Sequence, residues 1–305
     1  MLLDLNIVNY TNSILWHRTT YDMIGIRNLN LCWRISMFRN IKNGEVTLGN
    51  TKMSYVSFGR GNHTLVLLPG LSDGLTTVKG KALLLAKPYA AFFDRYTVYM
   101  FSRKNDMPKG YSIRDMADDQ AKAMDMLEIK KSCVMGVSQG GMIAQYLAID
   151  HPELVEKLVL AVTAPRANNM IQECVKQWIS FAEQGNHKKL MIDTAEKSYS
   201  PNYLNKYKKL YPIIGFIGKP LNYNRFLINA NAILEFDASN ELNKIACPTL
   251  IIGGKMDKTV GVRASYEMKN QITGSELYVY PKLGHAAYEE AKDFNQRVFK
   301  FLETL

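Results

Sequence analysis

Runs of apolar residues alternate with amphipathic stretches along the chain from about Glu45 onward. The run at 63–70 is almost wholly apolar, which is typical of a strand buried on both faces of a parallel sheet. Two short strands joined by a polar turn, at 45–49 and 53–59, predict an antiparallel hairpin before it. Further strands are expected at 95–104, 132–138 and 155–164, with helices at 112–129 and 139–150. This strand–helix–strand repetition predicts an α/β fold with a mostly parallel, doubly wound sheet and right-handed crossovers.

The alternation stops over residues 165–241, where helical patterns dominate and strand patterns are scarce. It resumes with predicted strands at 247–254 and 275–282 and predicted helices at 262–272 and 286–305. We therefore expect residues 45–165 and 240–305 to form one core, interrupted by a helical lid at 166–239 over the strand ends, where open α/β sheets bind ligands. Residues 1–44 show poor periodicity and no secretory-signal pattern, so they are treated as an extension without an assigned role.

Composition limits the classes of protein that fit this pattern. Hydrophobic residues make up 47% of the 305 residues and charged residues 22%, which is the balance of a soluble globular protein. No apolar run approaches the roughly 18 residues that a transmembrane helix needs. The net charge of +10 is scattered, and its densest patch, at 188–209, is interpreted as a solvated helix face because no nucleic-acid motif accompanies it. We expect no nucleic-acid partner, no transmembrane segment and a cytoplasmic location.

The four cysteines, Cys32, Cys133, Cys174 and Cys247, show no paired spacing. Cys133 falls in a predicted strand and Cys247 just before one, so both are interpreted as small core residues. Neither a zinc site nor a disulfide framework is expected, and this fits a reducing compartment.

One serine stands between glycines at the junction of a predicted strand and a predicted helix, in the segment GVSQGG. A side chain at the tip of so sharp a turn is exposed to substrate while its backbone is crowded, so residues two positions away must be small. Gly136 and Gly140 occupy those positions around Ser138. The spacing alone is common by chance, but at a strand end and a helix start it indicates a nucleophile. The first N–H groups of the new helix are free donors that suit an oxyanion.

A serine hydroxyl needs a base to take its proton, and the base needs an acid to orient it. Of the five histidines, His285 follows the last predicted strand, at the same sheet edge as Ser138. Asp257 lies in the loop after the strand at 247–254, whereas the loop after the strand at 155–164 contains no carboxylate. The sequence therefore predicts Asp257 as acid and His285 as base, in the chain order Ser, Asp, His. A capping or solvent-facing histidine and a structural loop aspartate are the alternative interpretations.

The loop after the first buried strand is expected to supply a second oxyanion donor. Gly70 allows close approach of the backbone, and the N–H of Leu71 would pair with that of Gln139, the residue after the candidate nucleophile. Ser72 and Asp73 could contact substrate, although loop polarity explains them equally well.

The chain resembles the α/β-hydrolase fold superfamily, in its lidded branch of small serine esterases, from about Glu45 to the C-terminus. The resemblance is carried by LVLLPGLSDG, CVMGVSQGGMIAQYLAIDHPELVEKLVLAVTA, CPTLIIGGKMDKTV and KLGHAAYEE. It implies Ser138 as nucleophile, Asp257 as acid, His285 as base, and Leu71 and Gln139 as oxyanion donors. Two segments depart from the pattern: Pro69-Gly70 stands where many members have His-Gly, and SRKNDMPKG replaces a common glycine-rich loop. Both departures bear on the substrate and not on the triad.

The implied reaction is acyl transfer to Ser138 from a small ester, thioester or amide, followed by hydrolysis of the acyl-serine by water that His285 activates. No metal or organic cofactor is expected, and the expected partner is a small molecule with an acyl group. The same residues would serve an acyltransferase or a carbon–carbon bond hydrolase. A ligand-binding receptor of the same fold, with little turnover, is a hypothesis from another class.

Overall fold

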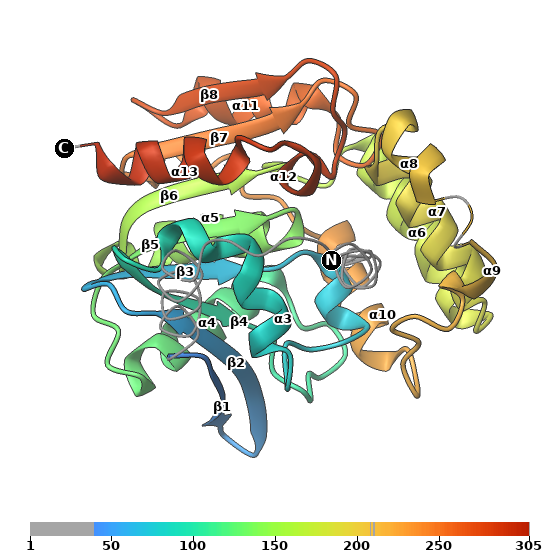
Figure 1. Cartoon of the computed structure of the whole chain (residues 1–305), viewed down its shortest axis with the longest axis horizontal. Coiled ribbons are helices and arrows are strands. Elements are labelled where there is room, and N and C mark those ends of the chain that lie inside the picture. The colour runs from blue at the N-terminus through green and yellow to red at the C-terminus, as the bar shows by residue number, and fades with distance from the viewer. Residues whose placement is uncertain (1–39, 208, 210, 305) are drawn as a thin grey trace, which may run out of the picture.

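Eight strands form one sheet in the order β1-β2-β4-β3-β5-β6-β7-β8 in the computed structural model (Figure 1), which describes residues 40–207, 209 and 211–304. The strands are β1 (Lys42–Leu48), β2 (Thr51–Gly59), β3 (His63–Leu68), β4 (Tyr96–Phe101), β5 (Ser132–Val137), β6 (Val155–Ala161), β7 (Thr249–Gly254) and β8 (Glu276–Tyr280). β2 runs antiparallel to β1 and β4, and the other neighbouring pairs are parallel. The predicted doubly wound, mostly parallel sheet is confirmed.

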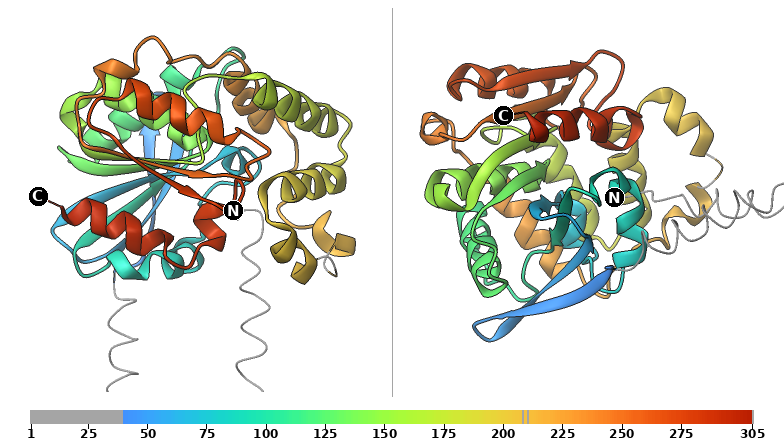
Figure 2. Two further views of the ribbon diagram at one scale, coloured as in Figure 1. Left: turned by 90° about the horizontal axis from the view of Figure 1, so that it is seen from above. Right: turned by 60° about the vertical axis from the view of Figure 1, so that its left-hand side comes forward.

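Period-two alternation divides the side chains of the central strands between two cores. In β6, Leu158 and Leu160 belong to one buried cluster, while Val159 and Ala161 belong to the other. Helices α4 (Ile113–Met126), α5 (Gln139–Asp150) and α11 (Val262–Gln271) contribute to the first cluster, and α3 (Ala82–Ala86) and α13 (Phe294–Glu303) to the second. Figure 2 shows helices on both sides of the sheet. Because both faces are covered, these strands are apolar throughout.

Five α-helices of the described residues lie between β6 and β7, and we call this segment the helical insertion. They are α6 (Asn169–Glu183), α7 (His187–Ser198), α8 (Pro201–Tyr207), α9 (Tyr211–Ile214) and α10 (Asn224–Leu234). Helices α6 to α9 stand together beside the sheet in Figure 1, at the right of the view. α10 packs against the loop after β3, where Gly74 lies against the backbone of Phe226.

Short elements differ most from the sequence prediction. The predicted helix at 286–305 is divided into α12 (Ala287–Glu290) and α13, because Ala291 between them is extended. The predicted helix near 202–216 consists of α8 and α9, and Pro212 lies in the first turn of α9, where proline is tolerated. α3 has no counterpart in the prediction, because five residues are too few to show a helical period. Short 3-10 helices cover Leu71–Gly74, Lys87–Phe92, Pro152–Leu154 and Leu242–Lys244.

Two sequence-based expectations concern the ends of the chain and the membrane. Most of the predicted N-terminal extension, residues 1–39, lies outside the described residues, as does Cys32. Across the part of the chain that is described, none of the helices is both long enough and apolar enough to cross a bilayer.

The N-terminus of α4 is closed by a reciprocal pair of hydrogen bonds. The Ser112 hydroxyl accepts from the N–H of Asp115 at 3.1 Å, and the Asp115 carboxylate accepts from the N–H of Ser112 at 2.9 Å. We expect Ser112→Ala to lower the free energy of unfolding by about 1 kcal/mol, because it leaves a helix N–H without an acceptor. Urea denaturation followed by circular dichroism measures the change, and Ser112→Thr is the control that keeps a hydroxyl. An alanine variant as stable as the wild type would contradict this role of the cap.

Candidate active site

Ser138 lies between the last residue of β5 and the first residue of α5, at a sharp turn. Its φ of 53° and ψ of −119° lie outside the regions that non-glycine residues favour. Such a conformation costs about 1–3 kcal/mol and persists only where neighbouring contacts hold it. The Ser138 N–H donates to the carbonyl of Ala161 at 2.9 Å, and the Thr163 hydroxyl donates to the carbonyl of Ser138 at 2.7 Å. The turn is therefore fixed by β6 and the loop that follows it.

Gly136 and Gly140 let three backbone segments meet next to Ser138. A Cβ at Gly136 would lie 2.3 Å from the Gly140 carbonyl oxygen, and a Cβ at Gly140 would lie 1.9 Å from the Leu68 carbonyl oxygen. A side chain at either position would therefore force β5, α5 and the end of β3 apart. The same close packing brings Gly70 beside the serine, since a Cβ at Gly70 would lie 3.4 Å from the Cβ of Ser138.

The predicted base and acid lie within hydrogen-bond distance of each other and of the serine. His285 Nδ1 is 2.9 Å from Asp257 Oδ2, and His285 Nε2 is 2.9 Å from Ser138 Oγ. The second carboxylate oxygen of Asp257 accepts from the N–H groups of Thr259 and Val260 at 2.8 and 2.9 Å. Since a carboxylate only accepts, this arrangement puts the imidazole proton on Nδ1 and leaves Nε2 to accept from the serine hydroxyl. The exposed fraction of the side chain is 1% for Asp257 and 10% for His285.

The loop that holds His285 is fastened to both the sheet and the helical insertion. At the end of β7, a Cβ at Gly254 would lie 2.3 Å from the Gly284 carbonyl oxygen, so loop and strand are in close contact. On the other side, the N–H of Ala286 donates to the carbonyl of Ser198 at the end of α7, at 2.8 Å. The position of the candidate base therefore depends on α7 as well as on β7.

Two backbone N–H groups, those of Leu71 and Gln139, lie on the segments that border Ser138. Leu71 follows Gly70 and begins the 3-10 helix after β3, and Gln139 is the first residue of α5. Within the part of the chain that the structure describes, neither N–H donates to a protein acceptor. Two free donors, one of them at the positive end of a helix dipole, suit an oxygen atom that gains negative charge.

A buried carboxylate anchors the segment that contains Leu71. Asp73 is 3% exposed, and its side chain accepts from the Ser102 hydroxyl at 2.6 Å. It also accepts from the Arg103 N–H at 2.9 Å and from the Arg225 guanidinium at 2.5 Å. Burial alone raises the pKa of Asp73, but the charges of Arg225 and Arg103 and these hydrogen bonds outweigh burial and hold the pKa below its usual value. The carboxylate of Asp73 is thus engaged by three protein partners.

Arg103 extends this network to the start of α5, and sequence reasoning missed its role. The side chain is 2% exposed, and its Nη2 donates to Oε1 of Gln139 at 2.8 Å. The Gln139 side chain in turn donates to the carbonyl of Asn229 in α10 at 2.9 Å. Burial lowers the pKa of Arg103 to about 10, although the charge of Asp73 opposes this shift. The signal that could have revealed Arg103 is a charged residue at the end of the apolar strand predicted at 95–104, in the segment that departs from the family pattern.

Other nucleophilic and metal-binding side chains form no second centre in the described part of the chain. Cys133 and Cys174 are buried and free, and burial raises the pKa of each thiol to about 12, so both remain thiols at neutral pH. Among the described residues, no group of three or more His, Cys, Asp and Glu side chains could hold a metal ion.

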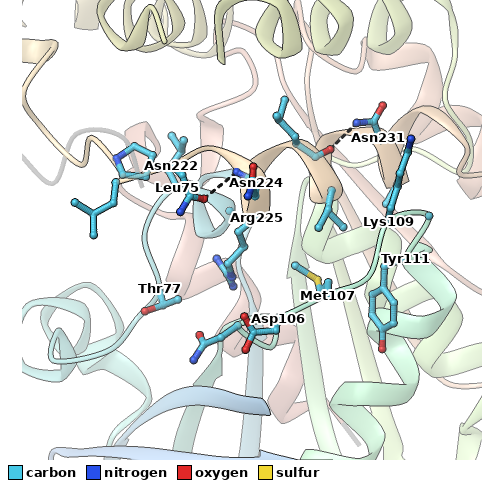
Figure 3. A pocket seen from close by; sticks show the side chains of 18 of the residues that line it. Leu75, Thr77, Asp106, Met107, Lys109, Tyr111, Asn222, Asn224, Arg225 and Asn231 are labelled. Carbon is cyan, nitrogen blue, oxygen red and sulfur yellow. Dashed lines mark hydrogen bonds between the residues drawn. The ribbon is translucent and has the colours of Figure 1, made fainter. Parts of the chain in front are cut away.

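A cavity of about 880 Å³ lies between α10 and the loop after β4 (Figure 3). Its wall is about equally polar and apolar and carries both signs of charge, with Arg225 pointing toward Asp106 and with Lys109 at the far end. The described residues that line it include none of Ser138, Asp257 and His285, so this cavity is separate from the candidate triad.

A smaller cavity, of about 260 Å³, is bordered by the loop after β3. Pro69 and Ser72 border it, and they stand on either side of Gly70 and Leu71. The described residues that line this cavity also include none of Ser138, Asp257 and His285, but Gly70, the residue after Pro69, lies against Ser138. It is therefore the better candidate for holding part of a substrate.

The sequence model of one family, described as the alpha/beta hydrolase fold, matches residues 94–292. A protein provisionally named carbamate hydrolase RutD, from Caulobacter sp. strain K31, is 25% identical over 252 residues, which cover 78% of this chain and 90% of that protein. A Pseudomonas protein named 2-hydroxy-6-oxononadienedioate/2-hydroxy-6-oxononatrienedioate hydrolase is 26% identical over 280 residues, covering 88% and 96%. The crystal structure of MGS-M2, an alpha/beta hydrolase enzyme from a Medee basin deep-sea metagenome library, matches with a TM-score of 0.75 at 18% identity, covering 86% and 98%. These matches confirm the fold that the sequence motifs implied.

The anchor at Asp73 predicts a large loss of stability when its charge is removed. We expect Asp73→Asn to lower the free energy of unfolding by about 3–5 kcal/mol, because Arg103 then remains buried without its counter-charge. Since the pKa of Asp73 is lowered by folding, its contribution is complete above the unfolded value near 4 and is lost as the pH falls through the lower folded value. Denaturation curves between about pH 3 and pH 7 should therefore converge for variant and wild type at the acidic end.

The control is Asp94→Asn, which removes a charge from an exposed pair with Arg60. We expect that change to cost less than about 1 kcal/mol. An Asp73→Asn variant no less stable than Asp94→Asn at neutral pH would show that Asp73 does not anchor the loop.

Proposed function

Since the chain is a hydrolase that belongs to the α/β-hydrolase fold family, we propose that it cleaves a small ester, thioester or amide through an acyl intermediate on Ser138. The observation that supports this most is the continuous hydrogen-bonded row from Asp257 through His285 to Ser138, with 2.9 Å at each link. The strained backbone of Ser138 agrees with it, because strain of this kind is concentrated at functional sites.

In the proposed mechanism, the Ser138 oxygen attacks the carbonyl carbon while His285 Nε2 takes the hydroxyl proton. The carbonyl oxygen becomes an oxyanion and accepts hydrogen bonds from the N–H groups of Leu71 and Gln139. Asp257 stabilises the imidazolium, which then gives its proton to the leaving group as the bond breaks. Water attacks the acyl-serine with His285 again as base, and the acid product leaves. These steps use only groups of the chain and water.

The helical insertion is proposed to act as the lid of this site, with the boundaries 166–239 expected from the sequence. Met191 of α7 and Ile217 after α9 line the smaller cavity together with Ser72 of the core, so the insertion would form one wall of the substrate site. A wall from the insertion and a floor from the core would exclude water from the acyl group, which strengthens the electrostatic effects of the oxyanion donors. The proposed partner is thus a small molecule with an acyl group.

A carbon–carbon bond hydrolase is the second candidate function. It is suggested by the relative named 2-hydroxy-6-oxononadienedioate/2-hydroxy-6-oxononatrienedioate hydrolase, whose alignment covers most of both chains. It would use the same Ser138, Asp257 and His285. An acyltransferase would also use them, with another acceptor in place of water, and a ligand-binding receptor would need none of their reactivity. These candidates differ in the bond that is cleaved, in the group that accepts the acyl chain, or in whether an acyl-serine forms at all, so product analysis separates them.

We expect a fluorophosphonate probe to label the protein covalently at one serine, and Ser138→Ala to abolish the labelling. The alanine variant should lose about 10⁴-fold or more in kcat on any substrate found, because the nucleophile and its base act as a unit. Gel fluorescence and mass spectrometry of the labelled peptide make the measurement. Ser239→Ala, which removes a hydroxyl outside the row, is the control and should label fully. Labelling of the Ser138→Ala variant at the wild-type level would refute the assignment, and a labelled protein that turns over no ester, thioester or amide would favour the receptor.

A further inference from the structure

The smaller cavity is bordered by the loop after β3, by α3 and by the helical insertion, and it is partly open to solvent. Most of its wall is apolar, contributed by Val78, Leu84, Leu85, Met100, Met191 and Ile217. Pro69 and Ser72 border the cavity, and between them in the chain stands Gly70, which lies against Ser138. An apolar space of this kind suits the methylene groups of an acyl chain.

One basic side chain enters this apolar wall. Lys81, the residue before α3, is the only Lys or Arg among the described residues that line the cavity. Its ammonium donates to the hydroxyl of Thr76 at 2.8 Å, and Thr76 lines the same cavity. Lys81 forms no ion pair with any acid in the described part of the chain. Asp73, which also lines the cavity, is occupied by Ser102 and two arginines.

The surroundings of Lys81 favour an anion that does not come from the protein. Lys81 is half-buried, and burial lowers the pKa of its amine, with the charge of Asp73 acting in the opposite direction. The ammonium is thus partly removed from water, and among the described residues no carboxylate lies within ion-pair distance of it. A substrate carboxylate beside Lys81 would stabilise the ammonium through a charge-assisted hydrogen bond, which is stronger than a hydrogen bond between neutral groups.

We propose that the cavity accepts the acyl chain of the substrate and that Lys81 binds a carboxylate at the far end of that chain. The substrates would then be esters, thioesters or lactones of dicarboxylic acids, with the reacting carbonyl at Ser138 and the free carboxylate at Lys81. This inference rests on the proposed role of Ser138, because it fixes which end of the acyl chain reacts. The apolar wall of the cavity and Lys81 would then bind two parts of the same substrate, the methylene groups and the carboxylate.

The test compares thioesters that differ only at the far end of the acyl chain. N-acetylcysteamine thioesters of glutaric, adipic and pimelic acid are paired with those of pentanoic, hexanoic and heptanoic acid, and thiol release is followed with a chromogenic disulfide. We expect kcat/KM to favour the dicarboxylic member of at least one pair. In Lys81→Met, the ratio of kcat/KM within that pair should fall about ten- to hundredfold, the range expected for one hydrogen bond between charged groups.

The matched control is Lys79→Met, which removes a lysine two positions away that is exposed and paired with Glu45. It should leave the ratio at the wild-type value, while Lys81→Arg should keep part of the preference. A wild-type enzyme that prefers the monocarboxylic member of every pair, or a ratio unchanged in Lys81→Met, would overturn the inference. So would failure to cleave any dicarboxylic thioester by a protein whose Ser138 is labelled by the fluorophosphonate probe. Absence of probe labelling would instead overturn the proposed function, and the inference with it.

Discussion

The close contact of three backbone segments at Ser138 is the constraint on which the rest of the site depends. β5 can turn into α5 so sharply only because Gly136 and Gly140 carry no side chain, and the end of β3 reaches the same point. The turn leaves one serine with a positive φ, held by hydrogen bonds from both sides. The loops after β7 and β8 then bring Asp257 and His285 to the same edge, because the carboxyl ends of parallel strands meet there.

The electrostatic setting of this edge follows from a few buried charges. Arg103 and Arg225 surround Asp73, so the network has one more positive than negative charge. Little water reaches it, since Asp73 and Arg103 are almost wholly buried. In the proposed mechanism, an excess of positive charge in this poorly solvated region would favour the oxyanion that accepts from the N–H groups of Leu71 and Gln139. The segment that carries Leu71 is thus both held and polarised by the same residues.

The local pattern of apolar, polar and glycine residues was sufficient to predict the features that depend on residues close together in the sequence. The strands of the sheet follow from apolar runs, and the turn at Ser138 follows from its flanking glycines. Arg103 could not be recognised in this way, because its burial depends on Asp73, 30 positions away, and on Gln139, 36 positions away. The split between α12 and α13 was missed for a similar reason, since an amphipathic period across 286–305 does not reveal that one residue is extended.

The helical insertion supports the core as well as covering it. α10 supplies the guanidinium of Arg225 to Asp73 and the carbonyl of Asn229 to Gln139, while the end of α7 holds the loop of His285. A shortened chain without the helical insertion would therefore not simply accept a wider range of substrates. It would lose the contacts that align the proposed catalytic residues Ser138, Asp257 and His285. During evolution, substitutions that alter substrate specificity would therefore be expected around α9, whose described residues make none of these hydrogen bonds. The contact residues of α7 and α10 would be kept.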